Sequence, residues 1–494
     1  MTGRARWLLA LSGGAVWGLC FGPSAWVVAP WVALVPLLLL LGQRRPAILG
    51  WLHGFAFWMV SIPWIIPTLR QHGGLSSGLA ILGLMALAAY LAAFTALFAA
   101  TGALLWRRGN LQALFGLPGL WVISEWLREM TFSGFPWNLA AYAWLDVPGS
   151  LPLTAWIGPH GLTYLVMLAN VAVALSIVER RWRLGATTLG SILLLLAAAG
   201  RWSGPGEAGA VTGAGIPVRV LQPNIGILSQ WDEATVEEQY QRIFEFSRQA
   251  CDRPGSLLIW PESAAWPYSY SRDERLRRDL ERLASEGCAV LVNTSMAGDG
   301  GTYNSLLLVD SKGLVGRYDK RHLVPYGEYV PMAGWLPFLQ KIARNAGAFL
   351  PGDRAELLAW NGEELAPAIC FEITFPSEVA EQVRSGGTIL VTVTNDAWYG
   401  DSWAPWQHYR AARFRAAENR RYLLRAAITG VSAIVGPRGE VEQQLGVGEE
   451  GILPGEIPGS VSLSPFTRYP WLMPAISFVI AAYALFLARK GPKT

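Results

Sequence analysis

The chain has 494 residues, of which 52% are hydrophobic and 15% are charged, with 24 Trp and a formal net charge of +4. Ordinary soluble domains contain roughly 25% charged residues, so this composition excludes a typical soluble protein and predicts a membrane protein. The small positive charge forms no basic stripe of the kind that binds nucleic acid, so we expect no nucleic-acid partner.

Long apolar stretches occur repeatedly in the first 200 residues and once near the C-terminus. Stretches of about 17 residues or more can cross a hydrocarbon core of roughly 30 Å as helices. A basic start before the first stretch could also belong to a cleaved signal peptide, but no A-x-A-like site follows it, so we expect a retained helix. The expected spans lie near residues 7–22, 26–42, 46–67, 75–106, 111–127, 160–178, 186–200 and 470–488.

The basic residues predict the orientation of these spans. Cytoplasmic loops of membrane proteins are enriched in Lys and Arg. If the N-terminus is cytoplasmic, the outer loops contain only Arg70 and Arg128, and both termini lie inside. The segments on the inner side then contain Arg4, Arg6, Arg44, Arg45, Arg107, Arg108, Arg180, Arg181, Arg183, Arg489, Lys490 and Lys493.

The character of the chain changes between residues 217 and 455, where short apolar strands alternate with charged helical stretches. Most of the strands are apolar at nearly every position, which is typical of sheets covered by helices. We therefore expect an α/β domain with layered sheets outside the cytoplasm, with helices near 233–250, 272–286, 376–384 and 405–425. The predicted organisation is seven transmembrane helices in 1–202, a linker in 203–216, the globular domain in 217–455, and a linker, final span and cytoplasmic tail in 456–494.

Four cysteines give no disulfide framework. Cys251 and Cys288 could pair in an oxidising compartment, but Cys288 in "GCAVLVNT" has the surroundings of a buried strand start. We therefore expect these two cysteines to remain unpaired.

Three predicted strand ends carry ionisable residues. "IWPES" contains Glu262, "GRYDKRH" contains Lys320, and "APAICFE" contains Cys370. A cysteine nucleophile needs a base to form the thiolate and a cation to hold the negative charge that develops on an attacked carbonyl. Taken singly, these residues could be a capping carboxylate, a solvated charge and a core thiol, and spacing cannot show that they meet. The globular part has no GxSxG, HExxH, CxxC or P-loop sequence, which argues against a serine triad or a zinc site.

These residues resemble a known family. Glu262, Lys320 and Cys370, within "WPES", "YDKRHLVPYGE" and "ICFE", are similar to the Glu-Lys-Cys triad of the nitrilase superfamily. With seven spans before the domain and one after it, the chain resembles the membrane branch, the apolipoprotein N-acyltransferases. Further matches are "LQPNIGILSQWD" (221–232), "TNDAWYGDS" (394–402) and "EWLREMTFSGFPWN" (125–138). The resemblance implies a polytopic α-helical membrane domain plus a nitrilase-like αββα sandwich domain.

The resemblance also implies a mechanism. Glu262 is expected to take the proton of Cys370, which attacks an acyl ester of a phospholipid, commonly phosphatidylethanolamine. Lys320 and the backbone N–H of Phe371 would stabilise the oxyanion. The acyl chain would then pass from the thioester to the α-amine of the diacylglyceryl-cysteine of an apolipoprotein. Phe371 departs from the family, which often has Tyr after the cysteine, so any role of that hydroxyl is lost.

Supporting roles are expected for Glu328 and Glu372, which could orient Lys320 or move protons, or could simply form structural ion pairs. No metal and no organic cofactor are expected. The family implies a monomeric, multi-pass protein of the bacterial inner membrane with its catalytic domain in the periplasm.

The stretch 329–353 is apolar and rich in Gly and Pro. Exposed apolar residues are a liability in a soluble enzyme, so we expect Trp335, Leu336 and Phe338 to form a lid that dips into the bilayer surface. Trp231 is a candidate gate on the other side, with a core Trp as the plainer alternative.

Charged residues near the end of one span are a further hypothesis. Glu125 and Arg128 precede an aromatic loop, residues 130–156, that we expect at the membrane surface. Ionisable residues within spans are functional candidates by default, so we expect this pair to interact, with topology anchoring as the plainer role.

Two alternative functions remain open at this point. A membrane-tethered nitrilase-type amidase would release its product acid to water, but one anchor helix would suffice for it. A transporter with an outer binding domain would need charges or interrupted helices near mid-membrane, whereas the ionisable residues here cluster at span ends.

Overall fold

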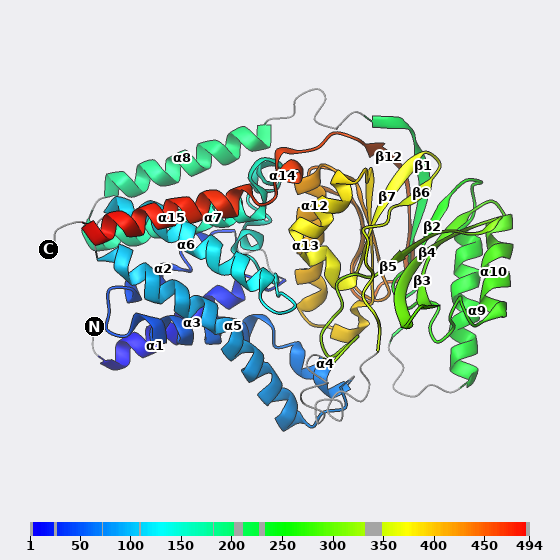
Figure 1. The fold of residues 1–494 in the computed structure, drawn as a ribbon, viewed down its shortest axis with the longest axis horizontal. Helices are drawn as coiled ribbons and strands as arrows, with labels where there is room; N and C mark the ends of the chain where they lie inside the picture. Colours follow the sequence, from blue (N-terminus) through cyan, green and yellow to red (C-terminus); the bar gives the residue numbers. More distant parts are fainter. Residues whose placement is uncertain are drawn as a thin grey trace. The chain divides into compact units, whose positions relative to one another are not determined.

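The computed structural model describes residues 3–490, apart from 24–26, 72, 108–109, 181, 202–210, 227–232 and 331–347. The chain forms two compact units, one helical and one α/β (Figure 1). The helical unit comprises Met1–Ile66, Ser76–Ser203 and Tyr469–Thr494, and the α/β unit comprises Pro67–Leu75 and Gly204–Arg468.

Four described helices are long and apolar enough to cross a membrane. They are α5 (Ser77–Trp106), α7 (Ser150–Glu179), α8 (Trp182–Arg201) and α15 (Leu472–Lys490). The pair α3 (Pro46–Ser61) and α4 (Ile65–Gln71), bent by 57°, makes a fifth if it is counted as one span. The expected eight spans are therefore not confirmed, and that number stays a prediction.

Three other predicted spans differ in outcome. Helices α1 (Gly3–Leu19) and α6 (Asn110–Met130) coincide with the stretches 7–22 and 111–127. The stretch 26–42 is not one helix, and this expectation was wrong. Its described part contains a 3-10 helix, η1 (Ala29–Trp31), and the short α2 (Val35–Leu40), each with a proline in its first turn. Proline is compatible with a first turn but not with a helix interior, so Pro30 and Pro36 break the run into two short pieces.

Helix α7 contains a break where it was expected to begin. Gly158 has a φ of 64° and precedes Pro159, which lies inside the helix. The residue before a proline avoids the α region, and glycine adopts a positive φ without steric cost. The predicted span 160–178 is the part of α7 that follows this break.

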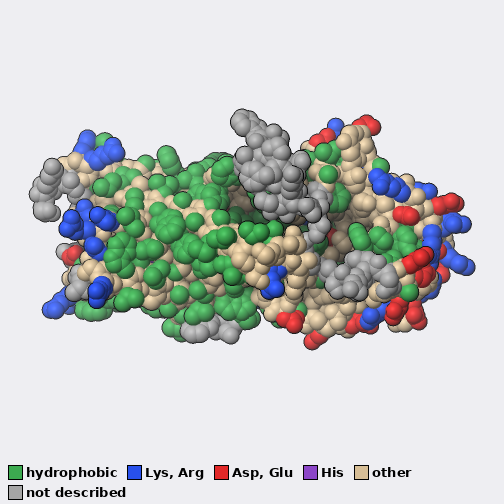
Figure 2. Space-filling view, turned by 90° about the horizontal axis from the view of Figure 1, so that it is seen from below, with side chains coloured by type: hydrophobic (Ala, Val, Ile, Leu, Met, Phe, Trp, Pro, Cys, Tyr) green, Lys and Arg blue, Asp and Glu red, His purple; other side chains and the backbone are tan. Residues whose placement is uncertain are grey.

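The surface of the helical unit is broadly apolar (Figure 2). Large side chains such as Leu8, Leu194 and Phe478 are more than half exposed. Figure 2 also shows Lys and Arg gathered at the end of this unit where Figure 1 places both chain ends. An apolar belt with basic residues at one end is what a membrane-spanning unit requires.

Glu125 and Arg128 are buried on α6 but bond to backbone and hydroxyl groups. Glu125 accepts hydrogen bonds from the Ala140 N–H at 2.9 Å and from the Thr163 hydroxyl at 2.9 Å. Arg128 donates to the carbonyls of Phe135 and Trp137 at 2.6 and 2.7 Å. The expected contact between the two charges is not among the described ion pairs; both side chains instead hold the loop that follows α6.

The α/β unit contains two six-stranded sheets. The first has the order β12-β1-β2-β3-β4-β5 and the second has the order β11-β10-β9-β8-β7-β6. In each sheet three neighbouring strands are parallel, β1-β2-β3 and β7-β8-β9, and the added strands are antiparallel. The strands of the first sheet are β1 (Val211–Gln222), β2 (Leu257–Ile259), β3 (Ala289–Gly298), β4 (Gly301–Asp310), β5 (Gly313–Asp319) and β12 (Gly451–Ser460). Those of the second are β6 (Leu358–Trp360), β7 (Glu363–Ile369), β8 (Ile389–Thr394), β9 (Leu423–Ala427), β10 (Ser432–Val435) and β11 (Val441–Leu445).

The two sheets pack face to face between two layers of helices. One core cluster joins their inner faces, with Leu257 and Ile259 from the first sheet and Leu365 and Ile389 from the second. A second cluster packs the outer face of the first sheet, including Leu258, against α9 (Glu233–Ala250) and α10 (Glu274–Ser285). A third packs the other outer face against α12 (Pro376–Arg384) and α13 (Ala404–Asn419). Figure 1 shows these helices on the two outer faces, so the expected αββα sandwich is confirmed.

Strands β1 and β12 extend beyond the domain boundaries that we expected. The boundary at 216 falls inside β1 and that at 455 falls inside β12. These strands pair antiparallel from Val211 opposite Ser460 to Gln222 opposite Gly451. The sheet therefore includes part of both predicted linkers.

The helix expected over 405–425 ends earlier than predicted. Helix α13 stops at Asn419, and Arg420 follows with a φ of 51° in the left-handed region. The chain then enters β9 at Leu423. The residues before and after this turn are both typical of helices, so the sequence did not indicate where α13 ends.

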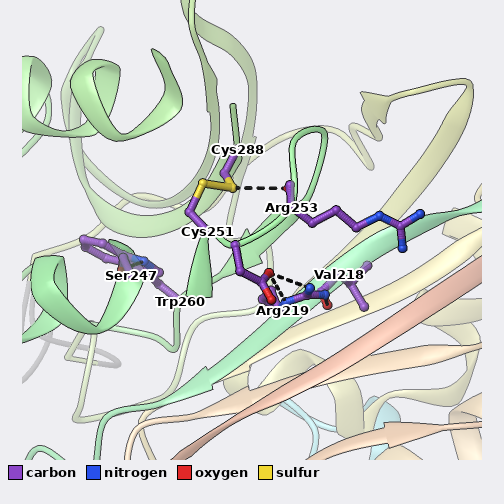
Figure 3. The surroundings of a disulfide bond; sticks show 8 residues. Val218, Arg219, Ser247, Cys251, Arg253, Trp260 and Cys288 are labelled. Atoms are coloured by element: carbon purple, nitrogen blue, oxygen red, sulfur yellow. Dashed lines mark hydrogen bonds and ion pairs between the residues drawn. A yellow bond between two sulfur atoms is a disulfide. The ribbon is translucent and has the colours of Figure 1, made fainter. Parts of the chain in front are cut away.

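Cys251 and Cys288 form a disulfide, so the expectation that they stay unpaired was wrong (Figure 3). Cys251 directly follows α9 and Cys288 directly precedes β3, and their Cα atoms are 5.9 Å apart. The packing of α9 on the first sheet, including a hydrogen bond from Trp260 Nε1 to the Ser247 hydroxyl, brings the two ends together.

Candidate active site

The three predicted triad residues follow strands of both sheets. Glu262 follows β2 and Lys320 follows β5 in the first sheet, whereas Cys370 follows β7 in the second. The sheets meet at this edge, because the Glu262 carboxylate accepts the backbone N–H of Asn395, which follows β8, at 2.9 Å. All three side chains are buried.

Lys320 is the centre of a group of charges. Its Nζ lies 2.9 Å from the Glu328 carboxylate and 3.7 Å from Glu262 Oε1, and the side chain is only 1% exposed. Burial acts to lower the pKa of Lys320, but the carboxylates of Glu328 and Glu262 outweigh it and raise that pKa above its usual value. Lys320 is therefore an ammonium at physiological pH.

An asparagine joins the two carboxylates. Asn304 Nδ2 donates to Glu328 Oε1 at 2.7 Å and to Glu262 Oε1 at 3.2 Å. Its own amide oxygen accepts a hydrogen bond from Asn293 Nδ2 at 2.7 Å, which fixes the orientation of the amide. Glu262 and Glu328 are thus held around Lys320 by neutral donors as well as by charge.

Cys370 lies at a strained point of the backbone. It is the first residue of the 3-10 helix η3 (Cys370–Thr374) and has a φ of 54°. Such a conformation in a residue other than glycine costs on the order of 1–3 kcal/mol and clusters at functional sites. Burial raises the pKa of the Cys370 thiol and Glu262 raises it further, while Lys320 opposes the rise. The resting protein therefore holds a neutral thiol beside a carboxylate and an ammonium.

Glu372 ties the loop that carries Lys320 to the strand that carries Cys370. Its Oε1 accepts the Tyr318 hydroxyl at 2.9 Å and the backbone N–H groups of Arg321 and His322 at 2.7 and 3.1 Å. Its Oε2 accepts the Ile369 N–H at 2.7 Å. Burial raises the pKa of Glu372, although these N–H groups and Lys320 partly offset the effect.

The ring of Phe371 lies close to two other aromatic rings. Its centroid lies 5.1 Å from that of Phe375 and 5.7 Å from that of His322. The side chain thus packs against the residue that follows η3 and against one on the loop after β5.

Four predicted substrate or lid residues, Trp231, Trp335, Leu336 and Phe338, lie outside the described residues. Among the described residues, no three or more His, Cys, Asp or Glu lie close enough together to hold a metal ion.

Sequence reasoning missed several residues of the site. Asn304 carries no charge and lies within a strand, so the sequence around it did not indicate a role in the site. Thr394, Asp396 and His408 lie within or close to the quoted "TNDAWYGDS" match but were given no role. Their place in the site becomes visible only in three dimensions, where Thr394 and His408 contact Cys370 and Asp396 contacts Thr394.

The chain matches two family descriptions in succession. "Apolipoprotein N-acyltransferase N-terminal domain" matches residues 13–172, and "Carbon-nitrogen hydrolase" matches residues 218–463. The first match covers most of the helical unit and the second covers most of the α/β unit.

Similar proteins extend over nearly the whole chain. An apolipoprotein N-acyltransferase of Geobacter metallireducens is 34% identical, covering 97% of this chain and 95% of its own length. One of Rhodopseudomonas palustris is 32% identical, covering 99% and 96%. Among solved structures, an amidase of the nitrilase superfamily from Nesterenkonia is 22% identical, with a TM-score of 0.38, and covers 51% of this chain and 94% of that chain.

Proposed function

This chain belongs to the apolipoprotein N-acyltransferase family, within the carbon-nitrogen hydrolase superfamily, and from this premise we infer how its residues perform acyl transfer. It is an acyltransferase of lipoprotein maturation. In our proposal Cys370 carries the acyl chain as a thioester, Glu262 is the general base and acid, and Lys320 stabilises the oxyanion.

The contact of Lys320 with Glu262 beside a buried thiol supports this proposal most directly. Base, cation and nucleophile come from three strand ends and are brought together in one place, with Glu262 and Lys320 both acting electrostatically on Cys370. Glu328 and Asn304 hold Lys320 and Glu262 in position. Glu372 is a supporting residue that fixes the Lys320 loop to the Cys370 strand.

In the first half-reaction, Glu262 takes the proton of the Cys370 thiol and the thiolate attacks an ester carbonyl of a phospholipid. The carbonyl oxygen becomes an oxyanion, which Lys320 and the Phe371 N–H stabilise. When the tetrahedral intermediate collapses, the carbon–oxygen bond breaks, Glu262 returns its proton to the leaving lysophospholipid, and a thioester remains.

In the second half-reaction, the α-amine of an apolipoprotein's diacylglyceryl-cysteine attacks the thioester. Glu262 takes a proton from the amine nitrogen, the carbon–sulfur bond breaks, and the departing sulfur is protonated to restore Cys370. The product is an amide, so the lipoprotein carries a third acyl chain. No step requires a metal or an organic cofactor.

The experiment that tests this function separates the two halves. Purified protein given phospholipid alone should acquire a hydroxylamine-labile acyl mass on the Cys370 peptide, and Cys370→Ser should not. Adding a diacylated lipopeptide with a free α-amine should then move the acyl chain to that amine. Release of free fatty acid to water, with no lipopeptide product, would instead support the amidase alternative.

We further propose that the donor is phosphatidylethanolamine and that the protein is a monomer. The similar proteins are bacterial, and four described helices are long and apolar enough to cross a membrane, which supports a membrane location. The proposed location is the inner membrane, with both termini cytoplasmic and the catalytic unit in the periplasm. The basic ends of the spans support this orientation. The disulfide supports it as well, because disulfides persist in oxidising compartments and are rare in the cytosol.

The apolar stretch around Trp335, Leu336 and Phe338 is proposed as the lipid-facing lid, with Trp231 as a gate. This proposal comes from the sequence alone. Replacing the three lid residues by Ser should weaken the use of phospholipid in bilayers but leave a short water-soluble thioester donor nearly unaffected. Equal use of the bilayer donor by variant and parent would contradict it.

A further inference from the structure

A second group of buried polar residues contacts Cys370. It comprises Thr394 at the end of β8, Asp396 at the start of the 3-10 helix η4 (Asp396–Tyr399), His408 on α13 and Arg425 in β9. All of these side chains come from the second sheet and its helix, and none is more than 1% exposed.

The Thr394 hydroxyl connects the sulfur of Cys370 to a carboxylate. Its Oγ1 lies 3.4 Å from Cys370 Sγ and 2.8 Å from Asp396 Oδ1. Burial acts to raise the pKa of Asp396, but Arg425, His408 and Thr394 outweigh it and hold that pKa below its usual value. Asp396 is thus an ionised carboxylate and can only accept, so in the resting state the Thr394 proton points to Asp396 and its lone pairs can accept the thiol S–H.

Deprotonation of Cys370 reverses this relation. A thiolate has no proton to donate, but the Thr394 hydroxyl can rotate and donate its own proton to the sulfur. Asp396 then keeps the Arg425 Nη2 donor at 2.7 Å. The loss of one hydrogen bond at Asp396 is therefore offset by a charge-assisted bond at the thiolate.

The same group also holds the backbone of Cys370. His408 Nε2 lies 2.9 Å from the Cys370 carbonyl oxygen, and because a carbonyl only accepts, Nε2 is the donor. Residues in strained conformations persist only where their surroundings fix them. His408 at the carbonyl and Thr394 at the sulfur fix both ends of a residue whose φ is 54°.

We propose that Thr394 is a further catalytic residue, which accepts the hydrogen bond of the Cys370 thiol and donates one to its thiolate, with Asp396 and His408 as positioning residues. The inference rests on the proposed role of Cys370 as acyl carrier. It adds a hydroxyl group to the base and cation already described. A network that only stabilised the fold would not need a contact with the reacting sulfur.

Four variants at two positions of one strand separate the role of the Thr394 hydroxyl from that of strand packing. Thr394→Val keeps the side-chain shape and removes the hydroxyl, Thr394→Ala removes it without adding a methyl group, and Thr394→Ser retains it. Thr392→Val is the control: Thr392 lies two residues earlier on β8 and is equally buried, and its hydroxyl bonds to no group in the described part of the chain.

Two measurements on the full-length protein test the proposal, the first in phospholipid micelles and the second in detergent micelles that contain no acyl donor. The first is the initial rate at which acyl-Cys370 forms from phospholipid alone. We expect Thr394→Val and Thr394→Ala to be about 10- to 100-fold slower, the scale of one hydrogen bond to a charged group. Thr392→Val should stay within about 3-fold of the parent, and Thr394→Ser should recover most of the rate that Thr394→Ala loses. The second is the pH dependence of Cys370 alkylation by iodoacetamide, whose midpoint should move to higher pH in Thr394→Val and Thr394→Ala only.

The outcomes distinguish this inference from the function on which it rests. If both hydroxyl-free variants form the thioester at the parental rate with an unchanged alkylation midpoint, the inference is wrong, while Cys370 keeps its role. If the rate falls equally in Thr392→Val, the loss reflects strand packing and the inference is again wrong. If Cys370→Ser still acquires the acyl group, the proposed function itself is wrong.

Discussion

Glu262 and Lys320 have opposite effects on the pKa of the Cys370 thiol. This difference allows an experiment to distinguish the two residues. The Glu262 carboxylate raises the pKa of Cys370 and the Lys320 ammonium lowers it, in addition to the larger increase from burial. In the proposed mechanism, the first step therefore depends on a balance of two charges that single substitutions can disturb in either direction.

We predict opposite shifts in thiol reactivity. Alkylation by neutral iodoacetamide requires only the thiolate, so its midpoint reports the Cys370 pKa. Glu262→Gln removes a negative charge and should move the midpoint to lower pH, whereas Lys320→Met should move it to higher pH. The measurement is labelling of the Cys370 peptide by mass spectrometry across pH, which separates it from Cys20.

Both variants should nevertheless fail to accumulate thioester. Losses of at least about 10²-fold are expected, the scale of one oxyanion donor. If the two midpoints moved in the same direction, the charges would not lie on Cys370 as described. A variant that formed thioester normally but stalled on the amine would belong to the second half-reaction.

Asn304 provides a second test at this scale. Its amide donates to both Glu262 and Glu328. Asn304→Asp removes both donors and places a third carboxylate between them, so we expect thioester formation to slow by at least about 10-fold. The matched control is Asn361→Asp in the exposed turn between β6 and β7, which adds the same charge away from the site. Equal rates in both variants would show that Asn304 serves only the fold.

At the scale of single elements, the disulfide between the end of α9 and the start of β3 should stabilise the α/β unit. It closes a sequence separation of 37 residues, which corresponds to about 3–4 kcal/mol in the chain-entropy description. We predict that the double variant Cys251→Ser/Cys288→Ser unfolds at a lower temperature than the parent.

Thermal unfolding with and without reductant checks this expectation. The parent should lose stability in reductant and the double variant should not respond to it. Cys20→Ser is the control, because Cys20 is a buried cysteine of the helical unit that takes no part in the disulfide. A parent whose melting temperature is unaffected by full reduction would contradict the prediction.

Elements with strong local patterns were predictable, and those defined by long-range pairing were not. The strands that end near Glu262, Lys320 and Cys370, the strand that starts after Cys288 and the charged helix α9 were expected at the right places, because burial on both sheet faces imposes an apolar sequence. Strands β6, β11 and β12 are short or mixed in polarity, so their sequences do not show that they pair with their neighbours. The disulfide was missed for the same reason: chain spacing does not show that Cys251 and Cys288 approach each other.

The residues of the site also fall into two classes, those that the sequence indicates and those that only contacts in the structure reveal. Glu262, Lys320 and Cys370 were found because ionisable residues at the ends of apolar strands are conspicuous. Asn304 and Thr394 are neutral residues on strands, and only three-dimensional contacts reveal that they bond to the charged groups and to the sulfur.

At the scale of the whole molecule, orientation in the membrane determines which compartment contains Cys370. The proposed arrangement places the α/β unit in the periplasm, where lipoproteins would present their amines. A phosphatase that is active only in the periplasm should be active when fused near residue 300, in the turn between β3 and β4, and inactive when fused near residue 183. The reverse pattern would move Cys370 to the cytoplasm and contradict the proposed function.

The pairing of β1 with β12 has a consequence for how such a protein could arise. These are the first and last strands of the sandwich, and they run side by side in opposite directions from Val211 opposite Ser460. A domain whose first and last strands are neighbours can be inserted into a host chain at one point, because the host must bridge only a short gap. In genetic terms, one insertion of a soluble enzyme gene between the seventh and last predicted spans would produce this order of elements, and the ancestral helices would need no rearrangement.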